Sequence, residues 1–185
     1  DAAWDNLPQS GSQGGRYILA ADPSIINTPE NDELVPVTFL EWLSGRIKRV
    51  VRSTLAAEAY VMGEGVEGID YLRYVLSELF SGRWRPEDRD ELAQEITAVT
   101  VTDARSLHDN LQKEGSSSKD RRLRLELNLI RDTPNLAVAW VRSEMQLADH
   151  LTKEVYARQV RESLLWTLGD DKRAPPSRRG RALVP

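Results

Sequence analysis

A glutamate lies inside the apolar face of the longest helix that the sequence predicts. From about Ser53 to Phe80, hydrophobic residues recur at three- and four-residue spacing, which is the period of an amphipathic helix. Glu58 falls between Leu55 and Met62 on this face, so its side chain is expected to point toward the core. An unpaired buried carboxylate is costly, so Glu58 should be protonated, paired or bound to a metal. The apolar positions are Leu55, Ala59, Met62, Val66, Ile69, Leu72, Leu76 and Leu79.

The segments around this helix predict an α/β domain with a mixed sheet. Strands come first, then the long helix, and later strands alternate with helices, which predicts an antiparallel front half and right-handed helical crossovers behind it. The glycine-rich stretch at 11–15 is expected to belong to a turn. A capping box from Ser143 to Gln146 predicts the start of a last helix that runs to about Leu168. The predicted strands cover 16–21, 35–42, 96–102 and 136–141, and the shorter helices cover 104–114 and 121–132.

Length and composition favour one folded domain at residues 1–168, followed by a disordered basic tail with prolines at 169–185. The chain has 185 residues, of which 40% are hydrophobic and 29% charged, as in soluble globular proteins. No apolar run approaches the roughly 20 residues that a membrane span needs. We therefore expect a soluble, intracellular domain without a membrane partner.

The residue types available for metal binding are oxygen ligands. The chain has no cysteine and only two histidines, His108 and His150, which excludes thiolate zinc sites and a histidine-rich site. A metal would have to be a hard cation such as Mg²⁺ or Mn²⁺, held by carboxylates. The formal net charge of -4 argues against coating of nucleic acid by bulk charge, but local basic patches remain compatible with binding it.

Three aspartates are candidates to meet Glu58. Asp1 precedes a probable strand, Asp103 ends a β-branched run, and Asp149 falls in the first turns of the last helix. Acids at strand ends in α/β sheets tend to face the ligand crevice, and several converging carboxylates would require a divalent cation. Simpler roles remain open: Asp103 fits equally well as a helix N-cap, and Asp149 as a solvated acid at a helix start. The simpler alternative for Asp1 is that it is only the first residue of the sequence and has no role in a site.

Five motifs in this order resemble the ribonuclease H domain of copia-type retrotransposon polyproteins. They are DAAW at 1–4, GSQGG at 11–15, KRVVRSTLAAEAY at 48–60, TDARSL at 102–107 and WVRSEMQLADHLTK at 140–153. The resemblance runs from Asp1 to about Lys153. It implies a ribonuclease H-like fold, with a mixed five-stranded sheet flanked by helices and a first strand that extends upstream of Asp1.

The resemblance also implies a function. It predicts hydrolysis of the RNA strand of an RNA/DNA hybrid with two Mg²⁺ ions, which Mn²⁺ can replace. On this basis Asp1 and Asp103 would bridge the metals, Glu58 would hold one of them and contact the ribose, and Asp149 would complete the second. The implied partners are the hybrid and the reverse transcriptase domain of the same polyprotein. The implied location is a retrotransposon particle in the cytoplasm, or the nucleus.

Basic and hydroxyl side chains near two predicted helix starts are candidates for phosphate contacts, although a solvated charged surface fits them as well. Many copia-type relatives carry a lysine-histidine pair where this chain has Arg121 and Arg122, so the auxiliary role of that histidine has no residue here. His150 is expected to be a surface or packing histidine. The candidates are Lys48, Arg49, Arg52, Ser117, Ser118, Lys119, Arg121 and Arg122.

Two other functions remain open at this point. A degenerate copy would keep the fold and act as an inactive structural or nucleic-acid-binding module attached to a reverse transcriptase. An integrase-type nuclease is disfavoured, because such sites generally carry their glutamate on a late helix, whereas Glu58 lies on the first.

Overall fold

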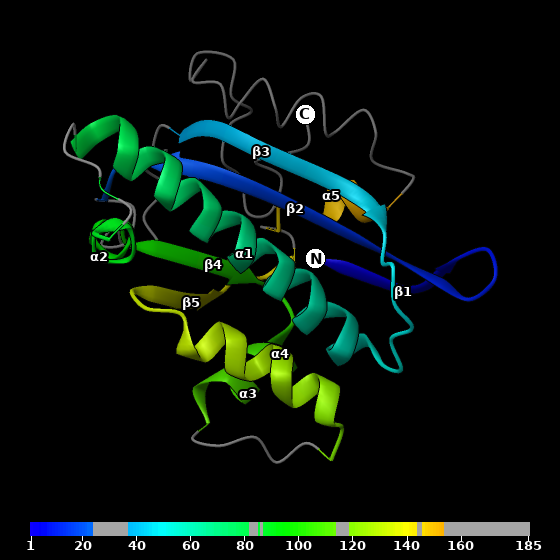
Figure 1. The fold of residues 1–185 in the computed structure, drawn as a ribbon. Helices are drawn as coiled ribbons and strands as arrows, with labels where there is room; N and C mark the ends of the chain where they lie inside the picture. Colours follow the sequence, from blue (N-terminus) through cyan, green and yellow to red (C-terminus); the bar gives the residue numbers. More distant parts are fainter. Residues whose placement is uncertain (24–36, 82–84, 86, 114–118, 144–145, 154–185) are drawn as a thin grey trace.

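The computed structural model describes residues 1–23, 37–81, 85, 87–113, 119–143 and 146–153. These residues form a mixed α/β structure in which three strands precede a long helix, and two further strands alternate with shorter helices (Figure 1). The strands are β1 (Ala2–Leu7), β2 (Gly11–Ala21), β3 (Val37–Arg46), β4 (Ala98–Thr102) and β5 (Leu136–Trp140). The helices are α1 (Thr54–Ser81), α2 (Arg89–Glu95), α3 (Arg105–Gln112), α4 (Arg121–Asp132) and α5 (Asp149–Thr152).

The described strands form two sheets. One is antiparallel with the order β1-β2-β3, and the other pairs β4 and β5 in parallel, with Thr102 opposite Trp140. The predicted antiparallel front half and the helical crossover to a later parallel strand are therefore confirmed. No ladder of backbone hydrogen bonds joins the two sheets within the described ranges. Asp1, just before β1, lies beside Asp103, just after β4, so these two strands meet near their ends.

Helix α1 confirms the predicted long helix and runs between the antiparallel sheet and α4 (Figure 1). It contributes to two hydrophobic clusters. One face packs on α3 and α4, and the opposite face packs on the start of β1 and on Ile47. The predicted apolar stripe is buried only in its first half, because the helix runs past the core and leaves Leu79 71% exposed. Within the described residues, no helix is long and apolar enough to cross a membrane. The first cluster contains Ala59, Met62, Val66, Leu107, Leu111, Leu123, Leu127 and Ile130, and the second contains Ala2, Ile47, Ala57, Tyr60 and Val61.

The glycine-rich stretch that the sequence predicted as a turn lies inside β2, and the turn is at residues 8–10 instead. A Cβ atom on Gly14 would lie 2.6 Å from a methyl of Val61 on α1, and one on Gly15 would lie 2.6 Å from Cβ of Leu151 on α5. Neighbouring residues of a strand point to opposite faces of the sheet. Helices α1 and α5 therefore approach β2 from opposite faces, and both need glycine at the contact.

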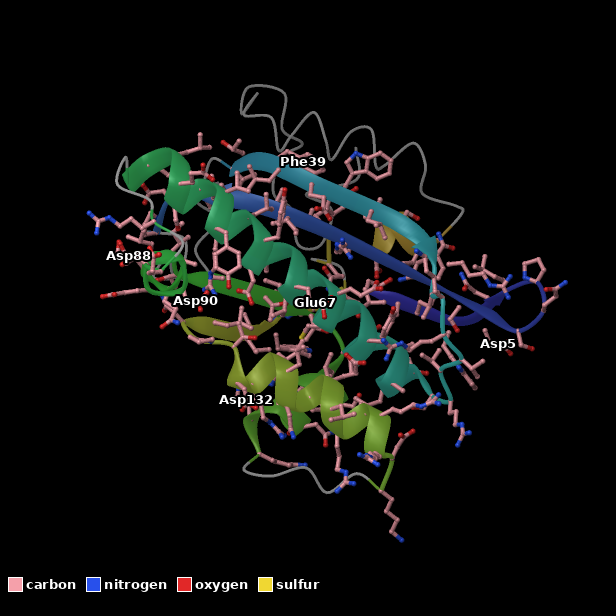
Figure 2. All side chains as sticks on the ribbon, in the orientation of Figure 1. Asp5, Phe39, Glu67, Asp88, Asp90 and Asp132 are labelled. Atoms are coloured by element: carbon pink, nitrogen blue, oxygen red, sulfur yellow. The ribbon has the colours of Figure 1, made fainter. Side chains whose placement is uncertain are left out.

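Two helices differ from the prediction. Residues 89–95 form α2, which the sequence did not predict, and Asp90 lies in its first turn (Figure 2). The Tyr74 hydroxyl on α1 donates to Asp90 at 3.2 Å. The last helix begins at Asp149 rather than at Ser143, because the Gln146 side chain accepts from the Ala148 N–H instead of closing a capping box. Helix α5 ends at Thr152 and Lys153 is extended, so the prediction of one continuous helix to about residue 168 is wrong at this point. Residues 154–168, the tail at 169–185 and part of 81–91 lie outside the described residues.

A buried arginine fastens α1 to the turn that leads into β5. Arg73 is 3% exposed, and its guanidinium donates to the carbonyl oxygens of Pro134 at 3.0 Å and Asn135 at 2.5 Å. The same group pairs with Asp70 at 3.1 Å. Because the Asn135 carbonyl also accepts from the Ala98 N–H at 3.1 Å, this contact joins α1 to the start of the parallel pair.

Replacing Gly15 with alanine is expected to lower the free energy of unfolding by about 1 to 3 kcal/mol, because the new methyl would push α5 away from β2. Urea unfolding followed by circular dichroism measures this change. Gly45→Ala on β3 is the matched control, since a Cβ there would meet only Leu43, at 3.9 Å. Equal stability of the two variants would contradict the close packing of α5.

Candidate metal site

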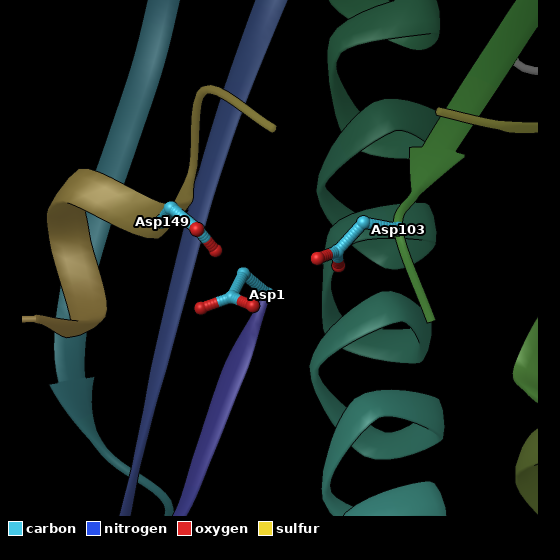
Figure 3. A group of neighbouring side chains, drawn as sticks. All are labelled: Asp1, Asp103 and Asp149. Carbon is cyan, nitrogen blue, oxygen red and sulfur yellow. The ribbon is translucent and has the colours of Figure 1, made fainter. Parts of the chain in front are cut away.

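Three carboxylates from distant parts of the chain come together where β1 begins and β4 ends. One oxygen atom of each of Asp1, Asp103 and Asp149 can be chosen so that all three atoms lie within 4.8 Å of one another. Figure 3 shows the three side chains pointing into a common space beside α1. The structure thus brings together three of the four acids that the sequence singled out.

The backbone around Gly15 places Asp1. The Asp1 carbonyl accepts from the Gly15 N–H at 2.9 Å, and the Asp1 amino group donates to the Gly15 carbonyl at 3.0 Å. The Thr152 hydroxyl on α5 donates to Oδ2 of Asp1. Asp1 is therefore held both along the sheet and from the face on which α5 packs.

Asp103 does not cap the helix that follows it. The N-cap of α3 is Ala104, with no capping bond from a side chain, so the simpler role considered for Asp103 is wrong and its carboxylate points into the cluster. The indole N–H of Trp140 donates to the Asp103 carbonyl at 3.0 Å, and the Thr102 hydroxyl accepts from the Ala104 N–H at 3.1 Å. These two contacts fix the turn that carries Asp103.

Asp149 is the first residue of α5, and side chains from the sheet hold that short helix by its backbone. The Leu151 carbonyl accepts from Gln13 Nε2 at 2.8 Å and from the Ser44 hydroxyl at 2.5 Å. The Asp149 side chain is only 16% exposed, so it is not the solvated acid that the alternative reading described. Its Oδ2 pairs with the Lys153 ammonium.

Thr152, Lys153 and Trp140 were not singled out from the sequence, although each makes a side-chain contact with one of the three aspartates. Lys153 stands four residues after Asp149, which is the spacing of a helical ion pair and was a usable signal. The contacts of Thr152 with Asp1 and of Trp140 with Asp103 join remote segments, so spacing alone gives no signal for them.

Glu58 is buried, as its helical position predicted, but it is not one of the three acids that meet. The residue is 6% exposed, and its Oε1 accepts from the Ala2 N–H at 3.1 Å. Burial raises the pKa of Glu58, and the nearby negative charges of Asp103 and Asp149 raise it further. The hydrogen bond from the Ala2 N–H acts in the opposite direction. Glu58 thus lies within electrostatic reach of the cluster and is partly satisfied by β1.

The oxygen set fits a hard divalent cation. Two ionised carboxylates about 5 Å apart repel by roughly 3 kcal/mol at an effective dielectric near 20, so three of them need positive charge. Asp149 Oδ1 is buried and has no hydrogen-bond partner within the described residues. Carboxylate oxygens are the ligands that Mg²⁺ and Mn²⁺ prefer. Asp1, Asp103 and Asp149 can therefore hold such an ion.

A separate basic pocket lies between the start of α1 and the start of α4. It has a volume of about 290 Å³. Four of the predicted phosphate-binding residues line it, namely Arg49, Arg52, Arg121 and Arg122. Lys48 and Lys119 are exposed but do not line it, and Ser117 and Ser118 lie outside the described residues.

The arginines of this pocket are not equivalent. Arg49 pairs with Glu126 at 2.7 Å and stacks over the Tyr60 ring at 4.1 Å, so it is held in place. Arg52, Arg121 and Arg122 are exposed. Asp120 caps α4 by accepting from two backbone N–H groups and places a negative charge at the pocket. An anion bound here would therefore rely mainly on the three exposed arginines.

Neither histidine belongs to the three-aspartate cluster. His150 is half-buried next to Asp149, and burial lowers the pKa of its imidazole, an effect that the Asp149 charge opposes. His108 lies on α3, where its ring nitrogen is 3.4 Å from Asp109.

No protein-family model, curated protein or solved structure matches this chain.

The Glu58→Gln variant without metal is expected to be more stable than the wild type at about pH 7. The raised pKa of Glu58 means that its ionised form is disfavoured in the fold, whereas glutamine is neutral and can still accept from Ala2. Below the ordinary value of 4.5 both side chains are uncharged, so the difference should grow above that value, where Glu58 of the unfolded chain ionises first, and level off once the pH exceeds the raised pKa of Glu58 in the fold. Thermal melting across about pH 4 to 7.5 tests this. A variant that melts lower than wild type at neutral pH would contradict it.

Proposed function

We propose that this chain is a metal-dependent nuclease of the ribonuclease H type that hydrolyses the RNA strand of an RNA/DNA hybrid. The observation that carries the proposal is the meeting of Asp1, Asp103 and Asp149, three of the four acids at the motif positions of that family. The motif order, the antiparallel strands followed by a long helix, and the parallel pair after it also support a ribonuclease H-like fold.

The three aspartates and Glu58 would hold the metal ions. Asp149 Oδ1, which is buried and unpartnered within the described residues, is the clearest candidate ligand atom. Because Oε1 of Glu58 accepts from Ala2, we assign its other oxygen to the site. Two bound Mg²⁺ ions, or Mn²⁺ in their place, would supply an activated water and stabilise the leaving oxygen of the phosphodiester.

The chain's own contacts would keep these ligands in place during the reaction. Trp140 fixes the backbone of Asp103, and Thr152 fixes one oxygen of Asp1. The α5 backbone is anchored by Gln13 and Ser44. Ligands that are already oriented lose little entropy when a metal and a substrate bind.

The basic pocket supports a double-stranded substrate. Ala56 and Tyr60, which line the pocket, are each two positions from Glu58, so they project about 200° away from it around α1. The acids thus lie on one side of these two turns of α1, and the pocket lies on another side. A helix is about 10 to 12 Å wide. A duplex lying across α1 would place one strand at the acids and phosphates of the other strand at the arginines.

Cleavage of a labelled RNA/DNA hybrid in Mg²⁺ or Mn²⁺ tests the activity. Asp103→Asn should lower the rate by about 100-fold or more, because it removes one charged ligand of the metal site. Asp109→Asn is the matched control, since this aspartate lies on α3 with a 46% exposed side chain and pairs with Arg105. Duplex DNA should remain uncut.

Hybrid binding without cleavage by the folded wild type would instead support the inactive ribonuclease H-like module attached to a reverse transcriptase. If the Asp103→Asn variant still cleaved the hybrid, the three-aspartate cluster would have no part in the cleavage mechanism. Equal cutting of duplex DNA would contradict the hybrid as the substrate class.

The double change Arg121→Gln and Arg122→Gln should weaken hybrid binding at every sequence and reduce the slope of log K against log salt by about 1 to 2. Arg124→Gln, on the same helix but outside the pocket, should leave both quantities near wild type. Fluorescence anisotropy at several salt concentrations measures them. Equal effects of the two changes would mean that the pocket has no special role.

A further inference from the structure

The segment that carries Asp149 also brings a positive charge to the acid cluster. Lys153 directly follows α5, and its ammonium pairs with Oδ2 of Asp149. The next polar contact from the same turn is uncharged, the Thr152 hydroxyl on Asp1. One turn of chain therefore provides a metal ligand, a hydrogen bond that holds a second ligand, and a cation.

The Lys153 ammonium lies where a positive charge reduces the repulsion among the three aspartates. Asp1, Asp103 and Asp149 lie close enough for mutual repulsion. Without a divalent ion, Lys153 lowers the repulsion at Asp149 directly. Its side chain is 45% exposed, so the ammonium can move into water at little cost.

We propose that Lys153 is the internal counter-cation of the acid cluster and that a divalent cation displaces it from Asp149. This inference rests on the metal site of the proposed function. Lys153 occupies Oδ2 of Asp149, whereas Oδ1 is buried and has no partner within the described residues. A doubly charged ion at Oδ1 would stand next to the ammonium on the same carboxylate, and repulsion would drive the lysine outward.

If a divalent cation displaces Lys153, replacing this lysine should change metal affinity and metal-free stability in opposite directions. A purely structural contact with Asp149 would not have this effect. Because the lysine and the metal compete for the same negative charge, removing the ammonium should strengthen metal binding and weaken the metal-free fold. If Lys153 served only to hold α5 in place, its loss would weaken both, since the ligand Asp149 would be less well positioned.

The test compares wild type with Lys153→Met, Lys153→Arg and Lys113→Met in the full chain. Calorimetric titration with Mn²⁺ at low ionic strength gives metal affinity, and thermal melting in chelator gives metal-free stability. Lys153→Met should bind Mn²⁺ about three- to tenfold more tightly and melt at a lower temperature without metal. Lys153→Arg keeps the charge and should stay near wild type. Lys113→Met removes an equal charge at the far end of α3 and should change neither quantity.

The outcomes separate the two proposals. Wild type that binds Mn²⁺ while Lys153→Met binds it equally or more weakly would overturn the counter-cation and leave the metal site standing. Absence of saturable Mn²⁺ binding by the wild type and every variant would overturn both. Tighter binding by Lys113→Met to the same extent would assign the effect to net charge rather than to Lys153.

Discussion

The arrangement of the candidate site depends on the absence of side chains at two consecutive residues of β2. Gly14 admits Val61 of α1 on one face, and Gly15 admits Leu151 of α5 on the other. Gly15 also pairs through its backbone with Asp1. These two neighbouring strand positions thus set the distances between the start of β1, the helix that carries Glu58 and the helix that carries Asp149. Any larger residue there would separate elements that must meet.

The cluster shows how a fold can tolerate concentrated negative charge. Three of the four acids differ in how their charge is reduced: a hydroxyl donates to Asp1, an ammonium pairs with Asp149, and the pKa of Glu58 is raised. Sites of this kind commonly reduce stability in exchange for function. Here the groups that reduce the repulsion come from β1 and from the α5 turn. The segments that build the site therefore also limit the loss of stability.

Much of the fold follows from local patterns, and for that reason it could be predicted. The extent of α4, and the burial of Leu123, Leu127 and Ile130, agree with the 3.6-residue period of the sequence. The burial of Glu58 follows in the same way from its phase on α1. The four acids could be named from motif positions, and the approach of three of them agrees with that prediction.

The failures involve contacts between remote segments. A glycine pair suits either a turn or close packing, and only the distant residues Val61 and Leu151 decide between them. The start of α5 at Asp149 follows the contact of the Gln146 side chain with the Ala148 N–H, and the helix is held in place by side chains of β2 and β3 on the Leu151 carbonyl, which the local capping signal at Ser143 does not reveal. From the sequence, Asp103 looked equally suited to cap α3. The Trp140 indole on β5 donates to the Asp103 carbonyl, and no local pattern reveals this contact.

That indole gives the molecule an optical property. Trp140 is joined to the backbone of a candidate ligand, and the Arg105 guanidinium lies over its ring at 5.0 Å. Trp4, by contrast, donates to the Val51 carbonyl rather than to one of the three aspartates. A shift of the Asp103 turn would alter the hydrogen bond and the charge seen by the Trp140 chromophore. The protein thus carries an intrinsic emission signal at the edge of its acid cluster, with no need for an attached dye.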